Sequence, residues 1–348
     1  MDSTLIKRIN LALQGGGAHG AFTWGVLDRL LDEPRIEIAA ISGTSAGALN
    51  AAAFKAGIIK GGAQGARENL DWLWGQVGAI NDPRFADWVA AFGPSTKLMA
   101  QMMSYSPAFA MLDAAARVMS PYAFGTSSSN PLEKIVSQLH FDDVCASEGP
   151  EIHICATNVR SGKIRVFTGA DVSVQAILAS ACLPTMFRAV EFKDPQTGKI
   201  EAFWDGGYTG NPALFPLFEM HLPDDILVVN INPLWRDDLP TDPQSIQNRI
   251  NEISFNSSLL RELRAIDFVD RLIADGKIAQ GQMKRVLVHM IADDPLMNDL
   301  NVATKTLAAP VVLARLKAAG QAAADAFLTA HFDDLNTRET VDLRAMFA

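Results

Sequence analysis

The residues most suited to chemistry lie in three short glycine-rich turns. The first is Gly43-Thr44-Ser45-Ala46-Gly47, a G-x-S-x-G pentapeptide between a β-branched apolar run at 36–42 and a small-residue helix. Gly43 and Gly47 leave room for a strained strand-to-helix turn that exposes a serine hydroxyl beside the positive helix end. Ser45 is therefore a candidate nucleophile. A serine or threonine that simply caps the helix would give the same pattern.

The second turn reads Gly15-Gly16-Gly17-Ala18-His19-Gly20, between a short strand expected over 9–14 and a helix expected over 21–31. Backbone amides in such a turn bind an anion. The spacing also satisfies G-x-G-x-x-G, but the next strand has its only acid, Glu37, near its start, where it cannot bind a ribose. The expected anion is therefore the transient oxyanion of an acyl transfer, bound by amides of Gly16 and Gly17 with help from Ala46.

The third turn, Asp205-Gly206-Gly207, follows a short strand expected at 202–204. A carboxylate held beside a serine hydroxyl can orient it and accept its proton. A hairpin Asp-Gly turn would explain the same residues without chemistry. A Ser-His-Asp triad is the nearest rival, because His221 and His289 follow Asp205 in the order of α/β-hydrolase triads. That fold normally places several strands before its nucleophile, and only one strand-helix unit precedes Ser45.

Strands alternate with helices along the chain, which predicts one mixed α/β sheet. Further strands are expected at 151–157, 164–168, 226–231 and 286–291, and further helices at 46–63, 64–77, 131–139, 173–181, 245–275 and 301–328. Loops after the first two strands of a parallel sheet emerge at one edge, which would bring Gly16 beside Ser45. Residues 333–348 are expected to form a loose tail.

Residues 82–129 differ from the rest, because prolines alternate there with aromatic residues and methionines. Flexible methionines and aromatics can form an adaptable apolar surface. We expect either a lid, or one wall of an acyl-chain cleft that touches membrane, or a helical cap whose methionines belong to the core.

The amino-acid composition limits the kinds of binding partner that are expected. The 348 residues, 49% of them hydrophobic, suit one large domain or two smaller ones. The net charge of -9 argues against nucleic acid and against polybasic attachment to membranes, so any peripheral membrane contact should be apolar. The N-terminus lacks a signal-peptide pattern, and a cytoplasmic location is expected. Cys145, Cys155 and Cys182 lack metal-ligand spacing and are expected to be buried thiols, and a metal site is not expected.

Taken together, the segments QGGGAHG, GTSAG, CLPTMF and DGGYTGNP resemble the patatin-like phospholipase family, over about residues 9–216. The resemblance implies a three-layer α/β fold with a central, mostly parallel sheet flanked by helices. It implies a single acyl hydrolase domain over 1–332 with a helical C-terminal part at 245–330, no metal or other cofactor, and a lipid or acyl-ester substrate.

The resemblance also assigns roles residue by residue. Ser45 becomes the nucleophile of a serine/aspartate dyad without histidine, and Asp205 becomes its base. Gly15, Gly16 and Gly17 become the oxyanion loop. Asn211 and Pro212 are implied to shape the loop that carries the aspartate, and the supporting residues of the site are Gly43, Gly47, Gly206 and Gly207.

His19 departs from the family pattern, since members often carry arginine there. Histidine gives less fixed positive charge, so we expect it to pack against or cap the loop. The activity expected is cleavage of fatty-acyl esters of phospholipids through an acyl-enzyme. The alternatives are a non-phospholipid carboxylesterase, a thioesterase, an intracellular polyester depolymerase, a non-catalytic lipid-binding protein of the same fold and a nucleotide-binding module. Head group, acyl-chain length and oligomeric state are left open.

Overall fold

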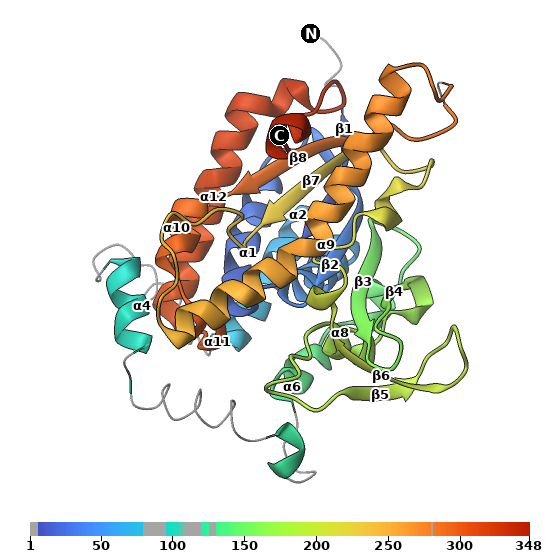
Figure 1. Cartoon of the computed structure of the whole chain (residues 1–348). Helices are drawn as coiled ribbons and strands as arrows, with labels where there is room; N and C mark the ends of the chain where they lie inside the picture. The colour runs from blue at the N-terminus through green and yellow to red at the C-terminus, as the bar shows by residue number, and fades with distance from the viewer. Residues whose placement is uncertain (1–5, 79–94, 105, 107–119, 125–129, 280) are drawn as a thin grey trace.

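The computed structural model describes residues 6–78, 95–104, 106, 120–124, 130–279 and 281–348. Within them an eight-stranded sheet has the order β5-β6-β3-β2-β1-β7-β8, with β4 also paired to β3 (Figure 1). The strands are β1 Lys7–Leu13, β2 Ile36–Thr44, β3 Glu151–Asn158, β4 Ile164–Thr168, β5 Val190–Lys193, β6 Ile200–Asp205, β7 Asp225–Asn230 and β8 Leu287–Ala292. Strands β3, β2, β1, β7 and β8 are parallel neighbours, whereas β4, β5 and β6 pair antiparallel. The predicted mostly parallel sheet is confirmed.

Helices cover both faces of the sheet and complete three layers (Figure 1). They are α1 Gly20–Leu30, α2 Ala46–Val77, α4 Thr96–Ser104, α6 Leu132–Val136, α7 Phe141–Val144, α8 Val174–Ser180, α9 Pro243–Ala274, α10 Asp294–Asp299, α11 Val302–Thr306, α12 Pro310–His331 and α13 Leu343–Met346. Alternate side chains of a strand face opposite ways, so β1 serves two cores. Leu11 and Leu13 pack with α1, α2 and α12, and Ala12 packs with α9.

The helices expected at 46–63 and 64–77 are both present, and α2 breaks between them at Gly61 and Gly62. Two other elements differ from the sequence-based expectation. The helix expected at 301–328 is divided into α11 and α12, because Pro310 has no amide N–H and forces Ala309 into an extended conformation. Strand β5, Val190–Lys193, is an additional strand that the sequence pattern does not predict.

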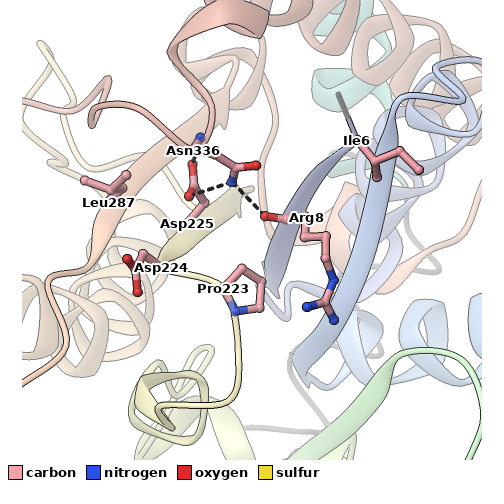
Figure 2. Close-up of a pocket in the computed structure, with 7 residues that line it drawn as sticks. All are labelled: Ile6, Arg8, Pro223, Asp224, Asp225, Leu287 and Asn336. Atoms are coloured by element: carbon pink, nitrogen blue, oxygen red, sulfur yellow. Dashed lines mark hydrogen bonds between the residues drawn. The ribbon is translucent and has the colours of Figure 1, made fainter. Parts of the chain in front are cut away.

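The expectation of a loose tail after Phe332 is wrong. Leu335 is fully buried, and the Asn336 side chain donates to Asp225 Oδ2 and to the Arg8 carbonyl, both at 2.8 Å (Figure 2). The Asn336 amide donates to Asp225 Oδ1 at 2.7 Å. These bonds fix the C-terminal segment, which includes α13, to the edge of the sheet where β1 and β7 begin.

The segment 82–129 lies mostly outside the described residues. Its described parts are α4 and a short 3-10 turn, Pro121–Phe124, so the expectation of a lid or cap falls on residues that are not described. Among the helices that are described, none is both long enough and apolar enough to span a bilayer.

Candidate active site

Ser45 occupies a strained turn between β2 and α2. Its φ of 54° and ψ of -120° are rare for a residue with a side chain and mark a backbone held by its surroundings. Its amide donates to Ser180 Oγ at 2.9 Å. A Cβ on Gly43 would lie 2.6 Å from the Gly47 carbonyl oxygen, and one on Gly47 would overlap the Leu13 carbonyl. Both glycines are therefore needed to seat the start of α2 against β1 and β2.

The glycine loop lies directly against this turn, as predicted. A Cβ on Gly15 would lie 2.6 Å from Ser45 Cβ, and Gly17 has a positive φ of 58° that favours glycine. Gly17 and Ala46 are the first residues of a 3-10 helix (η1, Gly17–His19) and of α2, where amides lack intrahelical acceptors. The Gly15 amide, however, donates to Asn211 Oδ1 at 2.6 Å. It is already committed to that bond, so it cannot serve as a free oxyanion donor.

Asp205 ends β6 two strands away from the serine turn. Asp205 pairs with Ala156 of β3, while the neighbouring Cys155 pairs with Thr44 of β2. Because adjacent strands lie about 4.8 Å apart, this register brings the carboxyl within side-chain reach of Ser45. Strand β6 runs antiparallel to β3 and approaches from the opposite direction to β2. The C-terminal ends of β2 and β6, which carry the serine and aspartate turns, therefore face each other across β3.

The Asp205 carboxyl is buried, with 1% of the residue exposed. The Gly207 amide donates to Oδ1 at 2.7 Å, while Oδ2 has no hydrogen-bond partner among the described residues. Burial raises the pKa of Asp205 to about 7, against the opposing effects of the Gly207 amide and the Ser45 hydroxyl. The Ser45 hydroxyl is therefore close enough to lower the pKa of the carboxyl, although it forms no hydrogen bond with Oδ2. Such a carboxyl exchanges a proton readily near neutral pH.

The histidines of the alternative triad lie elsewhere. His221 bonds Glu151 at 2.8 Å, and His289 bonds Asp225 at 2.9 Å. Both acids begin strands, so both pairs lie at the opposite edge of the sheet from Ser45. The structure therefore does not assemble the alternative Ser-His-Asp triad from either histidine.

The sequence model of the patatin-like phospholipase family matches residues 11–218, a range that includes all three glycine-rich turns. The chain belongs to the patatin-like phospholipase family. This family membership, now shown, carries the expectation of lipid acyl hydrolysis.

Two solved structures are similar to this family member at low sequence identity. VipD from Legionella pneumophila is 14% identical, with 93% of this chain and 67% of that chain covered and a TM-score of 0.42. The type III effector protein ExoU is 15% identical, with 95% and 54% covered and a TM-score of 0.35. The chain therefore spans about half to two thirds of their lengths. None of the curated proteins matches it.

Asn211 joins the glycine loop of this patatin-like protein to the aspartate turn. Besides accepting from the Gly15 amide, it donates from Nδ2 to the Gly15 carbonyl at 3.3 Å, and its own amide donates to Ser258 Oγ of α9 at 3.1 Å. Gln14 Oε1 accepts from the Asn232 amide at 3.0 Å, and Asn232 Nδ2 donates to the Gly15 carbonyl at 2.8 Å. Sequence reasoning missed Gln14, Asn232 and Ser258. The one available signal was a polar residue, Gln14, ending an apolar strand.

Two side chains of β2 also hold the aspartate turn. Thr44 Oγ1 donates to the Gly210 carbonyl at 2.7 Å, and Ser42 Oγ donates to the Ala213 carbonyl at 2.6 Å. The strand that leads into Ser45 therefore fixes both sides of the Asn211 position. Ser42 and Thr44, like Ser180, carry no sequence signal that would distinguish them from packing residues.

His19 is 1% exposed and packs beneath the glycine loop, with Nε2 at 2.9 Å from Thr304 Oγ1. Burial, with the nearby Lys305 charge, holds its pKa well below the usual value, so the ring is neutral. The charged group beside the loop is instead a lysine of α11, whose pKa is lowered by burial against the opposing effect of Glu252. Lys305 Nζ lies 3.3 Å from Asn232 Oδ1 and 3.4 Å from Glu252 Oε1, and a Cβ on Gly17 would overlap the Lys305 carbonyl.

The Cys182 thiol, beside Asp205, is not a competing nucleophile. The Cys182 carbonyl accepts the Asp205 amide at 2.8 Å, and Cys182 Sγ donates to the Arg188 carbonyl at 3.0 Å. Burial and the neighbouring carboxyl raise the pKa of Cys182 to about 12, so it stays protonated. Cys155 is buried, as expected, and Cys145 is half-buried.

Proposed function

We propose that this patatin-like protein hydrolyses fatty-acyl ester bonds of phospholipids through a Ser45/Asp205 dyad. Ser45 Oγ attacks the ester carbonyl carbon while Asp205 Oδ2 accepts the hydroxyl proton. The carbonyl oxygen becomes the oxyanion, and the amides of Gly16, Gly17 and Ala46 stabilise it. Each such donor contributes about 2.7 to 4 kcal/mol in the transition state.

Breakdown of the tetrahedral intermediate breaks the ester C–O bond, and Asp205 returns its proton to the departing alcohol oxygen. The acyl group stays on Ser45. A water then gives its proton to Asp205 and attacks the acyl carbon, and collapse restores the Ser45 hydroxyl and releases a free fatty acid. Gly15 does not contact the oxyanion in this scheme. Its bond to Asn211 fixes the glycine loop.

The observation that supports this assignment best is the state of Asp205. It is a buried carboxyl with one oxygen unpartnered, with a pKa raised to about 7, and close enough to Ser45 for the hydroxyl to influence it. A base of that strength can take the place of the imidazole of a triad, which supports the proposed dyad.

The test combines active-site labelling with lipid analysis. The wild-type protein should be labelled by a fluorophosphonate probe at Ser45 and should release fatty acid from phosphatidylcholine, detected by mass spectrometry. Ser45→Ala should lose both signals. Asp205→Asn should slow turnover by about 10² to 10⁴-fold, the usual contribution of a general base. The matched control is His221→Ala, which should keep wild-type rates. Loss of activity in the histidine variant with retention in Asp205→Asn would favour the triad instead.

The proposal also includes the bounds of the catalytic domain. We propose residues 1–332 as one acyl hydrolase domain, because all strands from β1 to β8 join a single sheet within the described residues. The ordered segment after Phe332 packs onto that domain. The cytoplasmic location stays a prediction from the sequence.

A further inference from the structure

Five exposed apolar side chains lie on the loop before α9 and on the first half of that helix. They are Trp235, Leu239, Ile246, Ile250 and Ile253, exposed by 70%, 87%, 42%, 53% and 55%. The three isoleucines follow the i, i+4, i+7 spacing that places side chains on one stripe of a helix. Single exposed apolar residues are common in soluble proteins, but a group on adjoining elements marks an interaction site. We call this group the α9 apolar surface.

Ion pairs hold the loop and the helix together, so the surface is one unit. Arg236 of the loop forms a two-point pair with Glu252 of α9, at 2.8 and 2.7 Å. Arg249 of α9 donates to the carbonyls of Pro233 and Leu234 at 3.3 and 3.2 Å. Glu252 is buried, so these contacts form beneath the exposed residues and fix the loop against the helix.

The surface is continuous with the candidate active site through the same two elements. The loop starts at Asn232, whose side chain donates to the Gly15 carbonyl. Two residues after Ile253, the Phe255 ring lies 3.1 Å from the position of a Cβ on Gly207. The first half of α9 lies near α10 and α11, whereas its second half runs toward the end of the molecule where the C-terminus lies (Figure 1).

We infer that the α9 apolar surface inserts into a neutral phospholipid bilayer and places the active site against the lipids that hold its substrate. The inference rests on the proposed function for the identity of the partner. The charges on and around the α9 apolar surface indicate that it inserts through apolar contacts and is not attracted to anionic lipids. The two arginines share Glu252, the loop carries Asp237 and Asp238, and the chain has a net charge of -9.

A second copy of the chain fits this surface less well. Five partly exposed side chains offer on the order of 500 Å², below the roughly 800 Å² per partner of a stable dimer. A bilayer needs no such area or shape complementarity, since each apolar group that leaves water contributes independently.

The experiment uses the full chain with Ser45→Ala, so that vesicles are bound without being consumed. Sedimentation with phosphatidylcholine vesicles should show binding that does not weaken between low and high salt. Adding Ile246→Ser, Ile250→Ser and Ile253→Ser together should weaken binding by at least about 100-fold, from the apolar burial that is lost. The matched control is Phe268→Ser, an equally exposed residue in the second half of α9, 54% accessible, which should bind as the parent does.

Three results would overturn the inference: no vesicle binding by the parent, equal binding by the triple-serine variant, or binding that requires anionic lipid and disappears in salt. If the parent self-associated without binding vesicles, and the triple-serine variant did not self-associate, the surface would be assigned to a second copy of the chain instead. With Ser45 restored, the triple-serine variant should turn over a soluble short-chain ester at the parental rate. Absence of any ester turnover would defeat the proposed function while leaving the vesicle result to decide the surface.

Discussion

Asp205→Asn should make the protein more stable, and the gain should grow with pH. The folded state holds the Asp205 proton more tightly than the unfolded chain does, because burial raises its pKa from 3.8 to about 7. Stability therefore falls as pH rises through that window, and it falls no further once the folded-state carboxyl is ionised. The full shift corresponds to about 4 kcal/mol, of which less than half has developed at about pH 5. Asparagine carries no charge at either pH.

Urea titrations of the two proteins at about pH 5 and about pH 8.5 would measure this effect. The free energy of unfolding of the variant, relative to wild type, should increase by about 3 kcal/mol between the two pH values. Asp225→Asn is the control, because Asp225 is buried too but has its pKa lowered, with bonds to His289 and Asn336. That substitution should destabilise the fold equally at both pH values. If Asp205→Asn also differed from wild type by a constant amount, the raised pKa and the base assigned to Asp205 would both be refuted.

Four further predictions follow from the same contacts. The kcat/KM of the wild type should rise with pH about an apparent pKa near 7, the value of Asp205; a profile flat from about pH 5 to 8 would contradict it. Asn211→Ala should lower kcat by about 10- to 100-fold, because the buried Gly15 amide loses its acceptor at a cost of about 1 to 3 kcal/mol. Lys305→Met should lower kcat for a soluble ester about tenfold with KM unchanged, since its charge lies behind the oxyanion donors rather than on substrate; a change in KM alone would reverse that reading. Ser180→Ala should cost about 1 to 3 kcal/mol of unfolding free energy in urea titrations, because the nucleophile's amide is left unpaired.

The strands and helices predicted around the first two glycine-rich turns are present in the structure, because a few neighbouring residues are enough to predict each of them. Gly43 and Gly47 bracket Ser45 within five residues, and the apolar run before them is long enough to show a buried strand. The convergence of the first two turns follows from a general property of parallel sheets, which makes it predictable as well. The antiparallel approach of β6 carries no local signal, since Ala202 to Trp204 would look the same in either direction.

Contacts between distant segments explain what the sequence could not provide. Gly15 is a plausible oxyanion donor by motif, yet its amide is occupied by a side chain 196 positions away, Asn211. The cation near the glycine loop is Lys305, from a short helix that matches no motif. The tail prediction failed for the same reason, because Asn336 depends on bonds to Asp225 and to the Arg8 carbonyl that only the folded chain forms.

In the proposed mechanism, the base is unstable while it is charged, whereas the oxyanion donors favour a negative charge beside them. Ionised Asp205 has no hydrogen bond on Oδ2 and is buried, so accepting a proton from Ser45 removes an unfavourable charge. In the proposed mechanism, attack on the ester moves that charge onto the carbonyl oxygen, beside the Gly16 and Gly17 amides. Negative charge would thus pass from a poorly solvated position to one where backbone dipoles are already fixed. A histidine would add a second proton carrier, but burial alone brings the pKa of Asp205 near that of an imidazole.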